Sequence, residues 1–174
     1  MNARKISICV ALATMSLLVA VLSAVSSTAA TINEKAPAIE LQNLTGKTVT
    51  LDSLKGKVVF VDFWASWCGP CKQEFPEMNK FISKYTDRDA VVLAVNIDKS
   101  RSHAEEFLSR IPDLSRKVLV VLDPDATVVA SYNARLMPTS FIIDKTGVVR
   151  FIHFGYNEDD PSKWASEIDA LLKQ

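Results

Sequence analysis

The fold of this chain is decided by the stretch Phe63-Trp64-Ala65-Ser66-Trp67-Cys68-Gly69-Pro70-Cys71. It overlaps a run of apolar and β-branched residues, 58–64, which predicts a central strand buried on both faces. A helix is expected to begin at about Pro70, so the two cysteines would lie at a junction between a strand and a helix. The unpaired N–H groups and partial positive charge of a helix N-terminus favour a thiolate over a thiol. The stretch therefore predicts a redox-active dithiol.

The cysteine count supports a redox role over a structural one. The chain has three cysteines, and Cys9 lies apart from the other two, near the N-terminus. A Cys-x-x-Cys disulfide closes so short a loop that it constrains the unfolded chain very little. We expect Cys68 to be the solvent-accessible attacking sulfur, and Cys71, one helical turn later, to be the resolving thiol. Because no histidine lies between them, the Gly69-Pro70 pair favours a reductant over a strong oxidant.

Residues 1–30 have the pattern of a targeting segment. Arg4 and Lys5 precede an apolar run over residues 6–25, and small residues follow at 26–30. This order is typical of a signal peptide, although the run is also long enough to be a membrane anchor. The small residues favour cleavage. In both cases the chain from about Thr31 onward is expected to be exported, and the bacterial periplasm is the expected compartment.

Residues 31–174 have the length of one domain with its own core. Without residues 1–30 the chain keeps 144 residues, with 18 basic and 20 acidic side chains. No basic patch interleaved with aromatic residues appears, so nucleic-acid binding is not expected. The charged clusters at 87–89, 105–106 and 158–160 are interpreted as solvated surface.

The order of the remaining patterns predicts an α/β fold with a mixed sheet. A hairpin is expected over 38–41 and 48–51, ahead of the strand that carries the dithiol. The helix after the dithiol should run to about Tyr85, with a kink at Pro76. The later elements are strands at 91–97, 118–122, 141–143 and 148–154, and helices at 102–110, 126–133 and 162–172.

Two acidic residues near the cysteines are candidates for moving protons. Asp62 interrupts an apolar strand, where burial of a carboxylate is costly and raises its pKa. Such an acid can take the proton of Cys71 during resolution, or it can lie at a strand end and bond to the backbone. Glu74 follows Cys71 by three residues on the same helical stripe, although an acid in the first turns is also stabilised by the helix dipole alone.

Other residues near the dithiol are candidates for binding substrate. Trp67 is expected to shield the disulfide and to present an apolar rim to partners, next to Gly69 and Pro70. Met137-Pro138 precedes a predicted strand, and a cis bond there would turn the Met137 backbone towards an extended substrate. Trans is the usual state of such a bond, so the residues alone leave this open.

A metal site fits the pattern less well. Structural zinc needs four ligands, and the remaining candidates, His103 and His153, are isolated and receive no role. A dithiolate that delivers Cu(I) is a further alternative, but no cluster of methionine or histidine lies near Cys68. No metal and no cofactor is expected.

From about Ala36 to Leu172 the chain resembles the TlpA/ResA-like branch of the thioredoxin superfamily, the exported thiol–disulfide oxidoreductases. The five residues Trp67 to Cys71 match the thioredoxin active-site sequence. The other shared motifs are the segments at 51–59, 63–76, 95–97, 137–141 and 143–147. Together these motifs are specific, whereas any one alone would not be.

The resemblance implies a thioredoxin-like fold with an N-terminal β-hairpin extension, and a cis bond at Pro138. It also implies Cys68 as nucleophile, Cys71 as resolving thiol, and disulfide-containing proteins as substrates. Asp62 matches the buried proton carrier of thioredoxins, and Glu74 matches the acid that tunes the cysteines in ResA-like proteins. Here both acids are present, which leaves open which of them handles the proton. Similar proteins often reduce apocytochrome c with electrons from a membrane thiol carrier, so the resemblance implies this substrate and this donor by analogy only. A net oxidant or isomerase remains an alternative, because direction also depends on electron supply.

Overall fold

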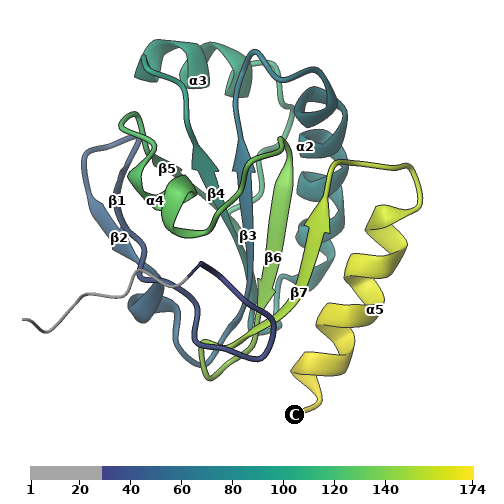
Figure 1. Ribbon diagram of the computed structural model, residues 1–174. Helices are drawn as coiled ribbons and strands as arrows, with labels where there is room; N and C mark the ends of the chain where they lie inside the picture. The colour runs from purple at the N-terminus through teal and green to yellow at the C-terminus, as the bar shows by residue number, and fades with distance from the viewer. Residues whose placement is uncertain (1–28) are drawn as a thin grey trace, which may run out of the picture.

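The computed structural model describes residues 29–174, which form one mixed sheet with helices on both of its faces (Figure 1). The predicted signal peptide or anchor, residues 1–30, lies almost entirely outside the described residues. Among residues 29–174, no helix combines the length and the apolar character needed to span a bilayer.

Within residues 29–174, seven strands form the sheet in the spatial order β2-β1-β5-β4-β3-β6-β7. The strands are β1 (Glu40–Asn43), β2 (Thr48–Thr50), β3 (Val58–Trp64), β4 (Ala90–Asn96), β5 (Val118–Leu122), β6 (Thr139–Ile143) and β7 (Val149–Phe154). β3, β4 and β5 are parallel, while β6, β7 and the β1–β2 hairpin pair antiparallel. This arrangement confirms the predicted mixed sheet and the hairpin extension, which joins the sheet at the β5 edge.

The helices are α2 (Gly69–Ile82), α3 (Arg101–Leu108), α4 (Thr127–Ser131) and α5 (Asp160–Leu172), with 3₁₀ turns η1 (Leu51–Leu54) and η2 (Ser83–Tyr85). The predicted elements are all present, with ends displaced by a few residues. The expected first helix is α2 followed by η2, and α2 runs through Pro76 to Ile82.

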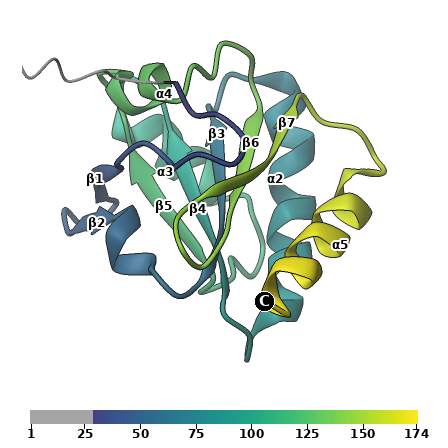
Figure 2. The ribbon, with the colours of Figure 1, turned by 60° about the horizontal axis from the view of Figure 1, so that its bottom comes forward.

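Alternating side chains of the strands divide the core into two halves. Phe60 and Trp64 point towards α2, α3 and α5 and pack with Phe75 and Trp164. The intervening residues of the strands face α4 and the N-terminal segment. Figure 2 shows α2 and α5 together on one side of the sheet. The face that packs on α2 is therefore the one that lies beneath the dithiol.

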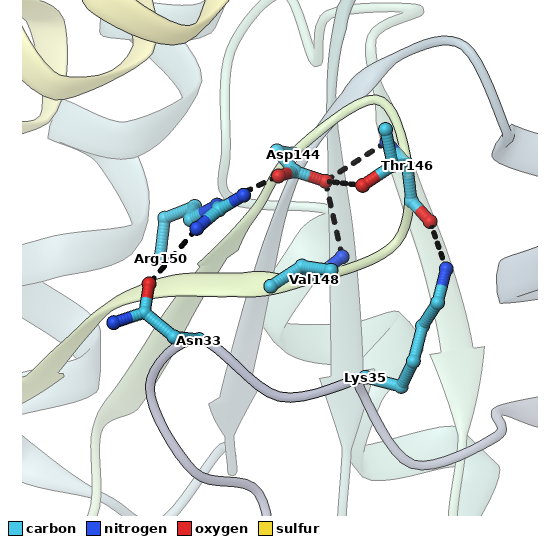
Figure 3. A network of polar contacts seen from close by, with 6 residues as sticks. All are labelled: Asn33, Lys35, Asp144, Thr146, Val148 and Arg150. Atoms are coloured by element: carbon cyan, nitrogen blue, oxygen red, sulfur yellow. Dashed lines mark hydrogen bonds and ion pairs between the residues drawn. The ribbon is translucent and has the colours of Figure 1, made fainter.

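A polar network around Asp144 holds the turn between β6 and β7, at the end of the sheet opposite the dithiol (Figure 3). Its carboxylate accepts hydrogen bonds from Thr146, from the Val148 N–H at 3.1 Å and from Arg150 at 2.7 Å. Burial alone would raise the pKa of Asp144, but these bonds outweigh it and lower the pKa to about 2. Arg150 also donates to Asn33, which ties the N-terminal segment to this turn.

Candidate active site

The two cysteines lie where β3 ends and α2 begins. Cys68 is the N-cap residue of α2, and Cys71 lies in the first turn. Their sulfur atoms are joined in a disulfide, and the Cys71 N–H donates to Cys68 Sγ at 3.2 Å. Once the disulfide is opened, the same N–H and the helix dipole favour a thiolate at Cys68. The site thus has the sequence-predicted geometry for a reactive sulfur.

The exposure of Cys68 is smaller than the sequence suggested. Cys68 is 5% exposed and Cys71 is 1% exposed, whereas the neighbouring Trp67 is 64% exposed. The expectation of a solvent-accessible Cys68 was therefore wrong for the oxidised form. The physical reason is that the disulfide holds Cys68 Sγ against the first turn of α2, inside the core cluster.

The segment before Cys68 is held by Asp98, which the sequence analysis missed. The Asp98 carboxylate is buried and accepts bonds from the Ser66 N–H and the Ser66 hydroxyl, both at 3.0 Å. Asn96 donates to the same carboxylate at 2.8 Å. An acid just after the predicted strand 91–97 was the available signal, but its partner lies 32 residues away in the chain.

Asp98→Ala is expected to lower the free energy of unfolding by about 1–3 kcal/mol, because it leaves the part-buried Ser66 N–H without its acceptor. Denaturant unfolding of the oxidised protein measures this loss. Ser66→Ala is the matched control, since it removes only the hydroxyl bond and should lose about 1 kcal/mol. Equal stability of Asp98→Ala and wild type would contradict a supporting function of Asp98.

Asp62 lies in β3 on the face covered by α2. Its side chain is fully buried, and neither carboxyl oxygen has a hydrogen-bond partner among residues 29–174. The alternative of an acid bonded to backbone at a strand end is therefore wrong. Burial disfavours the charged form and raises the pKa of Asp62. A carboxyl group whose pKa is moved towards neutrality is suited to accept and return a proton.

Glu74 is also buried, at 1% exposure, and both of its carboxyl oxygens lack a partner within the described part of the chain. Burial raises the pKa of Glu74, and repulsion from Asp62 and then Asp160 raises it further. The alternative explanation for Glu74, that the helix dipole alone stabilises an acid in the first turns, does not require the side chain to be buried. Because each of these carboxyl groups disfavours ionisation of the other, they titrate as a pair, and the site retains at least one proton over a wide pH range.

Asp160 corrects the interpretation of residues 158–160 as solvated surface. It is 4% exposed, accepts from the Asn157 N–H at 2.7 Å and pairs with Lys163 at 2.9 Å. Both contacts are local to the turn that starts α5. Docking of that helix also brings Asp160 close enough to Glu74 of α2 for its charge to raise the pKa of Glu74.

Asp62→Asn and Glu74→Gln are each expected to stabilise the oxidised protein at pH 8 by more than about 1 kcal/mol, or about 2–4 °C in Tm. In the folded protein the pKa of both acids is raised above the unfolded value of about 4. Their contribution to the free energy of unfolding is therefore fully present below pH 4, and it is lost as the pH rises through the folded pKa. Thermal unfolding from pH 4 to pH 9 should show a wild-type Tm that falls more steeply than that of either variant. Glu77→Gln, in a less buried part of the same helix, is the control. Parallel curves for all four proteins would disprove the burial effect.

The loop before β6 brings Met137 and Pro138 to the end of the sheet at which the dithiol lies. The Met137–Pro138 peptide bond is cis, as the resemblance implied. Thr139 pairs with Phe63 near the end of β3 and with Phe154 at the end of β7. Leu136 and Phe154 are 61% and 63% exposed, so large apolar side chains lie at the same end of the sheet as Trp67. Gly69 and Pro70 form the first turn of α2 beside them.

Comparison with known proteins agrees with this geometry. The family model described as Redoxin matches residues 31–172. The chain is 36% identical over 118 residues to the thiol-disulfide oxidoreductase ResA of Bacillus cereus, an alignment covering 68% of this chain and 66% of ResA. It is 38% identical over 122 residues to the thioredoxin-like protein YneN of Bacillus subtilis, covering 70% of this chain and 71% of YneN. The chain thus spans slightly under two thirds of the ResA relative.

A solved structure shows the same fold. A candidate thiol:disulfide interchange protein DsbE from Chlorobium tepidum superposes with a TM-score of 0.76 at 39% identity. The match covers 83% of this chain and 99% of that one. The fold is therefore thioredoxin-like, as the sequence predicted.

Proposed function

The chain belongs to the Redoxin family, and from this premise we propose that it is a thiol–disulfide oxidoreductase that reduces disulfides in protein substrates. The observation that carries the proposal is the Cys68–Cys71 disulfide at the N-terminus of α2, with the Cys71 N–H directed at Cys68 Sγ.

The reaction starts from the dithiol form. The Cys68 thiolate attacks one sulfur of a substrate disulfide, and the other substrate sulfur leaves as a thiolate that takes up a proton. Cys71 then loses its proton and attacks Cys68 Sγ, so the bond from Cys68 to the substrate breaks and the Cys68–Cys71 disulfide forms. Two electrons pass to the substrate, which leaves as a dithiol.

Asp62 and Glu74 supply the base for the second step. Cys71 is buried in the first turn of α2, and its thiol resists ionisation because burial disfavours a charge. The raised pKa of the pair makes its ionised carboxylate a stronger base than an exposed one, so this carboxylate can take the Cys71 proton and pass it on as the disulfide forms.

The surroundings of the dithiol suit a protein substrate. Large apolar side chains are exposed at the end of the sheet that carries the dithiol, namely those of Trp67, Leu136 and Phe154. An extended substrate segment would pair with the backbone of Met137 beside Pro138, in the manner of an added strand. Gly69 leaves room for its approach, because nothing lies within 4 Å of the position where a side chain would begin.

The direction and partners follow from motif and resemblance. A Gly-Pro pair between the cysteines lacks the cation that would make the disulfide strongly oxidising. The exported compartment is inferred from the pattern of residues 1–30, with cleavage favoured over anchoring. The resemblance supports apocytochrome c as a substrate and a membrane thiol carrier as the electron donor.

The test is reduction of insulin disulfides by the dithiol form, with a redox titration against glutathione and metal analysis after mild reduction. Turnover with a potential near that of reducing thioredoxins supports the proposal. A potential near those of strong oxidants would indicate a net oxidant or isomerase instead. Stoichiometric Cu(I) without turnover would indicate a metal-delivery protein.

A further inference from the structure

Asp62 belongs to a row of residues that crosses the sheet on the face beneath α2. The strand registers place Ala94 of β4, Asp62 of β3, Ser140 of β6 and His153 of β7 side by side. Alternation places all four on the same face. β3, β6 and β7 are neighbours in Figure 1, and α5 lies beside β7. Directly paired residues on one face have Cβ atoms about 5 Å apart, which is within the reach of one bridging water.

Asp62 has a polar neighbour in this row on one side only. On the β4 side Asp62 meets Ala94, whose side chain offers no donor or acceptor. On the β6 side it meets Ser140, whose buried hydroxyl has no hydrogen-bond partner in the described residues. Buried polar groups of this kind are normally satisfied by internal water. Asp62 and Ser140 therefore form a polar site within the core, next to the buried carboxyl group of Glu74.

The row ends near solvent. His153 Nε2 lies 2.8 Å from Oε2 of Glu167 in α5, and the two side chains are 17% and 20% exposed. An imidazole can accept a proton at one nitrogen while it gives one up at the other. His153 was assigned no role from the sequence, yet the register joins it through Ser140 to the buried acid.

We propose that Ser140, His153 and Glu167 form a path along which protons pass between Asp62 and solvent. This proposal rests on the proposed function, in which Asp62 takes the Cys71 proton. As Cys71 attacks Cys68 Sγ, that proton passes on from Asp62 through bridging water and the Ser140 hydroxyl to the His153 ring. His153 passes a proton from its other nitrogen to Glu167, and Glu167 releases it to bulk water. Asp62 returns to the carboxylate, and no electron moves in this step.

Other acids face the same region and offer a competing route. Glu74 approaches Asp62 from α2, and Asp160 acts on Glu74 from the start of α5. Glu167 faces His153 from the same helix. A proton could leave Asp62 through Glu74 and Asp160 instead, so the experiment has to separate the two routes.

The test compares Ser140→Ala and His153→Gln with wild type and with His103→Gln, which changes the other histidine of the chain. The dithiol protein is mixed with excess glutathione disulfide, and resolution is followed by stopped-flow tryptophan fluorescence between pH 5 and pH 9. We expect both row variants to resolve about tenfold more slowly at neutral pH, and His103→Gln to match wild type. Added imidazole should restore the rate of His153→Gln in proportion to its concentration, which a purely structural defect would not show.

Stability and double variants complete the test. Ser140→Ala removes an unpaired buried hydroxyl, so its thermal stability should not fall below that of wild type. Adding Ser140→Ala or His153→Gln to Asp62→Asn should cause no further loss, because the path would then have no proton to carry. Wild-type rates in both single variants, with a slow Asp62→Asn, would overturn the path and leave Glu74 and Asp160 as the exit. A wild-type rate in Asp62→Asn would instead overturn the proton function of Asp62 itself.

Discussion

Cys71→Ser is expected to accumulate mixed disulfides with its substrates through Cys68 and to lose essentially all turnover. Cys68 Sγ accepts the Cys71 N–H at the start of α2, which favours its thiolate, whereas Cys71 is buried behind it. Without a resolving thiol, the first covalent intermediate cannot collapse. Non-reducing electrophoresis after acid quenching, followed by identification of the trapped proteins, measures the accumulation.

Cys68→Ser is the matched control for this trap. It keeps Cys71 but removes the attacking sulfur, so it should trap no more protein than a variant that carries both Cys68→Ser and Cys71→Ser. Equal trapping by the two single variants would show that either sulfur can attack first, and the assignment of nucleophile and resolving thiol would fail.

Asp62→Asn and Glu74→Gln are each expected to slow resolution at neutral pH, by about 10²-fold for Asp62→Asn and less for Glu74→Gln. Both acids are buried without partners near the dithiol helix, and burial raises the pKa of each. Asp62 should matter more, because it lies in the central strand with no other base beside it in β4. If the two acids hold the proton as one unit, the double variant should lose less than the sum of the single losses.

The measurement is the pH dependence of resolution in all four proteins, followed by the fluorescence of Trp64 and Trp67. The wild-type rate of resolution should rise with pH as the acids ionise. A variant that lacks one of these acids should lose that rise. Glu77→Gln, one turn after Glu74 and more exposed, controls for a general change in the charge of α2. Wild-type profiles in both single variants would make water the proton acceptor.

Local sequence was sufficient for the dithiol and its setting. The junction between strand and helix could be predicted without knowing what packs on it, because its signals follow one another in the chain. These are an apolar strand, the Cys-x-x-Cys pair and the proline within that pair, in the first turn of the helix. Asp62 was predictable for the same reason, since one charge in an apolar strand contradicts the pattern around it. The cis bond at Pro138 needed the resemblance, because an X-Pro sequence is compatible with both isomers.

Tertiary structure alone decided how these parts are connected. Asp98 supports Ser66, and docking of α5 brings Asp160 close to Glu74, through contacts between segments far apart in the chain. The burial of Cys68 depends on closure of the disulfide against α2. The row from Asp62 through Ser140 to His153 depends on the register of β3, β6 and β7. A slip of one residue would turn Ser140 to the opposite face, and no local pattern in the sequence specifies that register.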